Sequence, residues 1–147
     1  IRSLQKSEKI LVRNPYATRP WQFVLEPLGG YLLLAAKMIE NPGKYCEAWN
    51  FGPEEDSVVN VRRIVELIIE NWGSGVWNSD NNKDGPHEAG LLALNIDKAK
   101  MQLDWRPKYS VETAIKETVG WYKECNISRN MYDYCVRQIQ RFSEDKD

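Results

Sequence analysis

One segment, residues 27–40, is apolar on two faces at once, and this feature constrains the fold more than any other. Pro27 suits the first turn of a helix, and Asn41-Pro42-Gly43 predicts that the helix ends after Glu40. The apolar side chains form two stripes, with Leu28, Leu32, Ala35 and Ile39 on one and Tyr31, Leu34 and Met38 on the other. Because each apolar stripe needs a surface that covers it, one neighbouring element is not enough. We expect this helix to pack between two partners.

The rest of the chain alternates short strand-like pieces with longer helical ones. Strands are expected at residues 10–13, 21–25, 48–52 and 91–94, with a further short strand at Trp77. Asn60 and Asp97 each precede an amphipathic run, so we expect them to cap helices that end near Gly73 and at Leu103. This alternation predicts an α/β or α+β domain with some parallel strand pairing and with few, short strands.

Two more amphipathic helices are expected at the end of the chain. The apolar face of the first consists of Val111, Ala114, Ile115, Thr118, Val119 and Tyr122. The apolar face of the second consists of Ile127, Met131, Tyr134, Cys135, Ile139 and Phe142.

Length and charge bound the class of protein. The 147 residues amount to about one domain. Lys and Arg number 20 against 21 Asp and Glu, so the net charge is −1 and no general positive field attracts nucleic acid. The longest purely apolar run, residues 31–36, is far shorter than the ~20 residues of a membrane span. We expect no nucleic-acid partner and no membrane span.

The three cysteines are Cys46, Cys125 and Cys135, an odd number without any CxxC pair. Neither a disulfide framework nor a structural zinc site is therefore indicated. The chain also shows no secretory signal pattern. These features favour a cytoplasmic protein without a bound metal.

Several kinds of catalytic chemistry find no support in these residues. His87 is the only histidine, and no GxSxG motif accompanies it, so a serine hydrolase is poorly supported. The glycines match neither the GxGxxG nor the GxxxxGK[ST] pattern that holds nucleotide phosphates. No tyrosine is followed four positions later by lysine, the spacing that lowers the pKa of a phenol for proton abstraction. We expect no dinucleotide site and no catalytic centre within this chain.

Most of the chain resembles a known family. The longest matching run is Arg13-Asn14-Pro15-Tyr16-Ala17-Thr18-Arg19-Pro20-Trp21-Gln22, followed by Val24-Leu25-Glu26-Pro27-Leu28 and Gly30-Tyr31-Leu32. Later pieces follow in the family's order: Trp49-Asn50-Phe51-Gly52-Pro53, Pro86-His87-Glu88-Ala89, Asp97-Lys98-Ala99, Leu103-Asp104-Trp105-Arg106-Pro107 and Trp121-Tyr122. These residues resemble the C-terminal half of the CDP-glucose 4,6-dehydratases, which are extended short-chain dehydrogenases/reductases. Looser forms of the later motifs recur across that superfamily, so the CDP-glucose assignment depends mainly on the ten-residue run.

The resemblance implies a C-terminal substrate-binding lobe, with a small short-stranded sheet and helices and without the Rossmann half. In that family the Rossmann half binds NAD and carries the Tyr-x-x-x-Lys pair, so this chain, which begins at Ile1, is expected to be an inactive fragment of a lyase. Residues 1–125 would form the nucleotide-sugar-binding region, and residues 126–147 a C-terminal helical extension. The full-length protein, expected to be a homo-oligomer, would convert CDP-glucose to its 4-keto-6-deoxy derivative.

Four residues are expected to bind substrate because of their places in the matching motifs. Arg19 corresponds to the family's arginine for the nucleotide diphosphate, and a guanidinium can bond two phosphate oxygens at once. Asn50 corresponds to a position near the phosphate and ribose, and Arg13 to a strand edge that meets the base. His87 stands where related dehydratases carry a phosphate-binding arginine. A solvated surface role is the alternative for each of them.

Two other interpretations remain open. The chain could belong to another nucleotide-sugar dehydratase or to an epimerase, or it could be a standalone, non-catalytic nucleotide-sugar-binding module. In the family, the helix at 27–40 packs against the cofactor domain. Without that domain its second apolar stripe would be exposed, so we expect the chain alone to self-associate, exchange domains or dissolve poorly.

Overall fold

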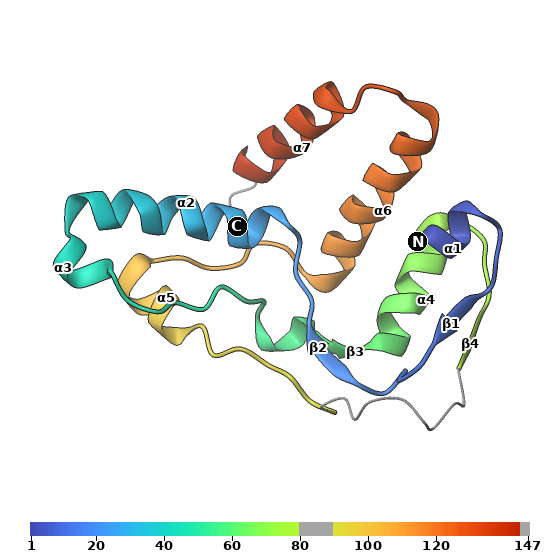
Figure 1. Cartoon of the computed structure of the whole chain (residues 1–147), viewed down its shortest axis with the longest axis horizontal. Helices are drawn as coiled ribbons and strands as arrows, with labels where there is room; N and C mark the ends of the chain where they lie inside the picture. Colours follow the sequence, from blue (N-terminus) through green and yellow to red (C-terminus); the bar gives the residue numbers. More distant parts are fainter. Residues whose placement is uncertain (80–89, 145–147) are drawn as a thin grey trace.

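The computed structural model describes residues 1–79 and 90–144. Helices lie at both ends of an elongated molecule, and short strands run through its middle and along one end (Figure 1). The elements in chain order are α1 (Arg2–Gln5), β1 (Ile10–Val12), β2 (Thr18–Pro20), α2 (Leu25–Glu40), α3 (Pro42–Tyr45), η1 (Glu55–Ser57), β3 (Val58–Asn60), α4 (Val61–Trp72), β4 (Trp77–Ser79), α5 (Asp97–Leu103), α6 (Val111–Ile127) and α7 (Tyr132–Glu144). The expected class, short strands combined with helices, is confirmed.

The strands form two small sheets instead of one. β1 pairs in parallel with β4, and β2 pairs antiparallel with β3 so that Thr18 lies opposite Asn60. The other edge of β2 is also occupied: the Thr18 N–H donates to the Gly90 carbonyl at 2.8 Å, and the Leu92 N–H donates to the Thr18 carbonyl at 3.1 Å. β2 is therefore held on both edges. The parallel pairing expected from the alternation of elements is confirmed in β1 and β4.

Three of the expected strands, at 21–25, 48–52 and 91–94, do not form. Residues 21–25 do not form a strand, because the partners of the chain here, β3 and the Gly90 segment, pair with the preceding residues of β2 instead. Residues 48–52 have no strand partner among the described residues, and a strand forms later, at β3. Of residues 91–94, only Leu91 makes a β-bridge, to Thr18. Tertiary pairing thus overrides local strand propensity at these places.

Helix α4 begins and ends where the sequence predicts. The Asn60 side chain caps it by accepting a hydrogen bond from the Arg63 N–H at 2.9 Å, and Gly73 ends it in the left-handed conformation with φ of 97°. Its buried face packs against α6 in a cluster that contains Ile64, Leu67, Val111, Ile115 and Val119. This packing of two amphipathic helices stabilises one end of the molecule, as Figure 1 shows for the green and orange helices.

Two later helices differ in detail from the expectation. Helix α5 covers Asp97–Leu103 as predicted, but its first residue is not the cap: the Asn95 side chain accepts from the Asp97 N–H at 3.1 Å. Helix α7 begins only at Tyr132, so Ile127 and Met131 lie outside it. Ile127 is the last residue of α6 and is exposed. The chain between these helices breaks the continuous apolar face that the sequence suggested.

A buried carboxylate joins the start of α2 to the segment that leads into α6. The Glu26 side chain is 1% exposed, and its Oε1 accepts hydrogen bonds from the backbone N–H groups of Lys108 and Tyr109 at 3.0 and 2.8 Å. A buried hydrogen bond contributes about 0.5–1.5 kcal/mol, and leaving a buried carboxyl oxygen without its donors would cost about 1–3 kcal/mol or more. This connection fixes one end of α2 relative to α6.

Of the two apolar stripes predicted on helix α2, the one with Tyr31, Leu34 and Met38 is only partly covered, because Tyr31 and Met38 are exposed and Leu34 is half-buried. Leu33 and Leu34 pack against a buried cluster around Phe51 and Trp105. The other stripe, which we call the α2 ridge, consists of Leu28, Leu32, Ala35 and Ile39, and all four are exposed. Leu32 and Ile39 keep 73% and 85% of their surface exposed. None of the described helices has the length and hydropathy of a membrane span.

We predict that lysines on the ridge, in Leu32→Lys combined with Ile39→Lys, weaken self-association of this chain. Covering a leucine-sized side chain contributes about 1.5–3 kcal/mol, so each substitution should weaken association about tenfold or more. Sedimentation velocity over a wide concentration range measures the effect. Met101→Lys is the matched control because Met101 is 84% exposed on α5, outside the ridge. An unaltered chain that stays monomeric throughout this range contradicts the prediction.

Candidate functional site

Arg19 lies in the middle of β2, in a strand fixed on both edges. Its side chain is half-buried, and its Nη1 donates to the carbonyl of the preceding Thr18 at 2.8 Å. The strand opposite supplies Val59, whose carbonyl accepts a hydrogen bond from the Trp21 indole N–H at 3.0 Å. The backbone around Arg19 is therefore well supported, and its guanidinium is a planar group with five N–H donors.

Asn50 is exposed in the irregular segment between α3 and η1. Its Nδ2 donates to the Asn95 carbonyl at 3.2 Å, which fixes the plane of the amide. A side-chain amide has two N–H donors and a carbonyl acceptor, so this hydrogen bond leaves one donor and the acceptor for other partners. Donation to a ligand oxygen, the chemistry predicted from the sequence, is compatible with this geometry.

Phe51, the next residue, anchors the same segment in the core. Its ring is buried and contacts Trp105 edge to face, with 4.9 Å between ring centroids. On the other side the ring lies against the backbone of α2 at Gly30, where an added Cβ would come within 2.4 Å of Phe51 Cδ1. We call this close approach the Gly30 notch. It explains why glycine occupies a helix interior, where it ordinarily lowers stability.

Gln22 connects the segment of Arg19 with the segment of Asn50. Its Nε2 donates to the Phe51 carbonyl at 3.0 Å, across 29 positions of sequence. The structure therefore brings two of the predicted site residues, Arg19 and Asn50, onto neighbouring segments. Sequence reasoning included Gln22 in the family-like run but gave it no role, because a single amide between two aromatic residues has no recognisable spacing signal.

The other two predicted site residues are Arg13 and His87. Arg13 is exposed and directly follows β1, and a turn closed by the Ala17 N–H donating to the Asn14 carbonyl at 3.4 Å separates it from β2. The structure thus places Arg13 and Arg19 on opposite sides of this turn. His87 lies outside the described residues. The segment that resumes at Gly90 lies beside Thr18, next to Arg19 in sequence.

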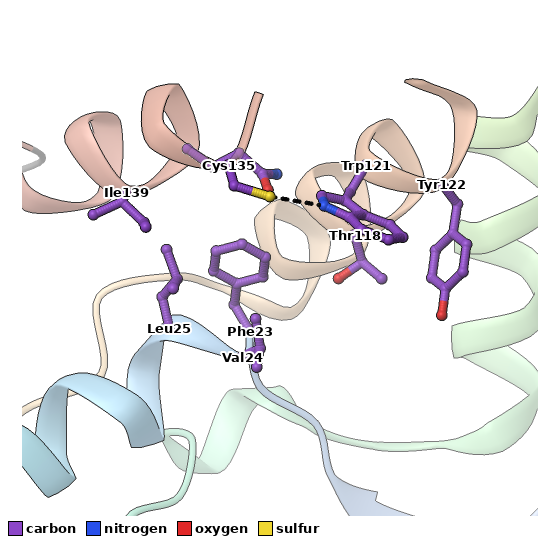
Figure 2. A pocket seen from close by; sticks show the side chains of 9 residues that line it. Phe23, Val24, Leu25, Thr118, Trp121, Tyr122, Cys135 and Ile139 are labelled. Atoms are coloured by element: carbon purple, nitrogen blue, oxygen red, sulfur yellow. Dashed lines mark hydrogen bonds between the residues drawn. The ribbon is translucent and has the colours of Figure 1, made fainter. Parts of the chain in front are cut away.

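A cavity of about 420 Å³ lies elsewhere, between the start of α2 and the two last helices. Figure 2 shows the side chains of Phe23, Leu25 and Ile139 around it, and the Trp121 indole N–H that donates to Cys135 Sγ at 3.3 Å. The remaining lining residues are Val24, Thr118, Tyr122 and Gln138. The amide of Gln138 donates to the backbone carbonyl and the carboxylate of Glu117. The cavity is therefore largely apolar, and these polar groups are engaged with the protein itself.

Tight contact between α6 and α7 supports this region. At Gly120 an added Cβ would approach the Tyr134 hydroxyl to 2.8 Å, so the two helices meet closely here. Partial burial raises the pKa of Tyr134, with the nearby Glu117 carboxylate adding to the effect. The phenol therefore remains neutral across the physiological pH range. Its hydroxyl packs against Gly120.

Four of the described glycines lie inside a helix or at its end. NAD-binding folds use glycines in a turn from a strand into a helix. Here Gly29 and Gly30 lie inside α2, Gly73 ends α4, and Gly120 lies inside α6. Within residues 1–79 and 90–144, no group of three or more His, Cys, Asp or Glu side chains could hold a metal.

Comparison with known proteins identifies relatives along nearly the whole chain. No family model matches. The chain is 39% identical over 143 residues to the CDP-glucose 4,6-dehydratase of Salmonella typhimurium, a match that covers 97% of this chain and 40% of that enzyme. The resemblance to the CDP-glucose 4,6-dehydratases is confirmed. The chain spans well under half the length of this relative.

Solved structures show the same fold. The chain superposes on a UDP-glucose 4-epimerase of Thermotoga maritima, solved with UDP-glucose, with a TM-score of 0.64 and 21% identity over 84% of this chain and 37% of the epimerase. A dTDP-glucose 4,6-dehydratase of Bacillus anthracis, solved with NAD, gives a TM-score of 0.64 and 22% identity over the same shares. The fold is that of the C-terminal portion of extended short-chain dehydrogenase/reductase proteins.

The Gly30 notch yields a matched pair of predictions on one helix. Gly29→Ala should raise the free energy of unfolding by about 0.5–1 kcal/mol, because alanine favours a helix and nothing lies within 4 Å of its Cβ. Gly30→Ala should lower it by about 1–3 kcal/mol, because the methyl group overlaps the Phe51 ring. Urea unfolding of the chain measures both. Equal stability of the two variants would contradict the notch.

Proposed function

We propose that this chain is the substrate-binding portion of an NAD-dependent CDP-glucose 4,6-dehydratase. The observation that carries the proposal is the 39% identity that extends over 97% of the chain. The arrangement of Arg19 and Asn50 on segments joined by Gln22 supports it, since a nucleotide sugar needs both a cation and neutral hydrogen-bonding groups. The longer protein would be a lyase, and this portion alone would be inactive.

In this proposal the site residues contact different parts of the nucleotide sugar. Arg19 holds the diphosphate, and Asn50 contacts the phosphate–ribose region through its remaining donor and acceptor. Arg13, at the end of β1, reaches toward the cytosine base, and His87 contributes to the phosphate site. Each charge-assisted hydrogen bond from Arg19 would contribute about 1.5–3 kcal/mol when it is partly shielded from water.

NAD would be bound by the remainder of the longer protein, since Gly29, Gly30, Gly73 and Gly120 lie inside or at the end of helices and not in a phosphate-binding turn. That remainder would include the Rossmann domain, and the α2 ridge is the surface that we propose it covers. We propose further that residues 1–125 form the binding region, that residues 126–147 extend it, and that the full-length protein is a cytoplasmic homo-oligomer.

A dehydratase or epimerase for a different nucleotide sugar is the alternative function. The likeness of the fold to an epimerase solved with UDP-glucose favours this alternative. A standalone binding module is the second alternative. The reading frame upstream of Ile1 separates it from an enzyme, because an enzyme requires a glycine-rich strand–turn–helix segment there.

Calorimetric titration of the full-length gene product with CDP-glucose, UDP-glucose and GDP-mannose tests the proposed substrate. CDP-glucose should bind at least tenfold more tightly than the other two. Conversion of CDP-glucose to the 4-keto-6-deoxy product should accompany binding. Preference for UDP-glucose or GDP-mannose would establish the alternative enzyme, and binding without turnover would establish the module.

We predict that Arg19→Met in the full-length protein weakens CDP-glucose binding about 10- to 100-fold, because it removes charge-assisted hydrogen bonds to the diphosphate. Arg19→Lys should lose less, since it keeps the charge but not the planar fork. Isothermal titration calorimetry measures both. Arg62→Met is the control because Arg62 is exposed on α4 and pairs with Glu66 there. Unchanged affinity in Arg19→Met would remove Arg19 from the site.

A further inference from the structure

The Gln22 side chain is half-buried, and its two polar atoms have different surroundings. Nε2 donates to the Phe51 carbonyl at 3.0 Å. Oε1 is buried and finds no hydrogen-bond partner among the described residues. Reversing the amide would place two carbonyl oxygens together, so the Phe51 carbonyl determines which way the amide points.

A buried acceptor without a partner lowers the stability of the folded state. Gln22 therefore stabilises a backbone segment through one atom and destabilises the fold through the other. An apolar side chain of the same length would fill the space without an unpaired atom. A residue that stabilises the fold less than an available alternative is expected at functional positions more often than in a core.

The atom that Gln22 holds belongs to the segment of Asn50. The Phe51 ring is fixed between the Gly30 notch and Trp105, and its carbonyl is fixed by Gln22, so the backbone of Phe51 is held at both its side chain and its carbonyl. Asn50 is bonded directly to this residue, and its amide is held by the Asn95 carbonyl. The direction in which Asn50 presents its remaining donor thus depends on Gln22.

The same side chain is three residues from Arg19. Trp21, between them, donates its indole N–H to the Val59 carbonyl, which holds the chain after β2 against β3. Gln22 extends from this supported segment to Phe51. Its hydrogen bond therefore sets the separation between the cation of β2 and the amide of Asn50.

We propose that Gln22 is a positioning residue for nucleotide-sugar binding, which sets Asn50 relative to Arg19 through the Phe51 carbonyl. This inference rests on the proposed function of the site and adds a residue to it. Gln22 acts through Asn50 and does not itself contact the ligand.

Gln22→Met in the full-length protein tests the inference. Methionine has a similar length, packs in the same space, and lacks both the donor and the unpaired acceptor. The KM for CDP-glucose should rise about two- to tenfold, because one neutral hydrogen bond is lost, while kcat stays within about twofold because Asn50 is placed away from the reacting carbons. The melting temperature should stay the same or increase. A purely structural role would lower the melting temperature along with the affinity.

Two comparisons make the test specific. Gln5→Met is the matched control, since Gln5 is exposed and its Nε2 donates to Asn126 Oδ1, far from the site in the fold; it should leave KM unchanged. In the double variant Gln22→Met with Asn50→Ala, the rise in KM should be smaller than the product of the single effects, because both act through Asn50. If Gln22→Met lowers the melting temperature, Gln22→Leu is the second variant, and it should raise KM by a similar factor without that loss.

The outcomes separate this inference from the proposed function. If the unaltered protein prefers another nucleotide sugar, the CDP-glucose assignment is wrong, and the same KM comparison is made with the preferred sugar. If it binds its nucleotide sugar but neither Gln22 variant changes KM, only the positioning role is overturned. Multiplying effects in the double variant, or a parallel loss of melting temperature and affinity, would also overturn it. A full-length protein that binds no nucleotide sugar overturns both.

Discussion

The contact between the Phe51 ring and the bare backbone of Gly30 supports the rest of the structure. Because no side chain intervenes at Gly30, α2 lies directly on the aromatic cluster that also contains Trp105. The same packing holds the irregular segment of Asn50, which has no strand partner among the described residues. Side-chain packing thus replaces backbone pairing as the source of order in this segment. The position of Asn50 in the candidate site therefore depends on the packing of the Phe51 ring against Gly30.

The inner face of helix α2 is fixed by packing, whereas its outer face is exposed. Its inner face is fixed by the notch and by the buried carboxylate of Glu26, which holds the start of the helix against the segment before α6. Its outer face carries the ridge, where apolar side chains remain in water. A helix that is rigidly held and apolar on its free side is well suited to bind a second rigid body, because little conformational entropy is lost when it docks.

The sequence was a good guide where signals were local. Asn60 and Gly73 fix the ends of α4 through a side-chain cap and a left-handed residue, and both can be recognised from neighbouring residues alone. On α2, spacing predicted the stripe of Leu28, Leu32, Ala35 and Ile39, but it missed Leu33 on the packed side and left Tyr31 and Met38 on a stripe that the structure exposes. The expected strands at 21–25 and 48–52 failed because strand formation depends on partners distant in sequence, such as Gly90 for Thr18. Gln22 was missed as a link between segments for the same reason, since its partner lies 29 positions away.

The long-range contacts also govern how such a chain is made. Thr18 needs the backbone around Gly90, and Glu26 needs Lys108 and Tyr109, which follow it by 82 and 83 positions. During synthesis on the ribosome, the first quarter of the chain must wait for these residues, a delay on the order of ten seconds at typical translation rates. Until then the Glu26 carboxylate stays hydrated and the apolar residues of α2 lack their core. In that interval the apolar side chains of α2 are exposed, and exposed apolar surface on an incomplete chain favours aggregation.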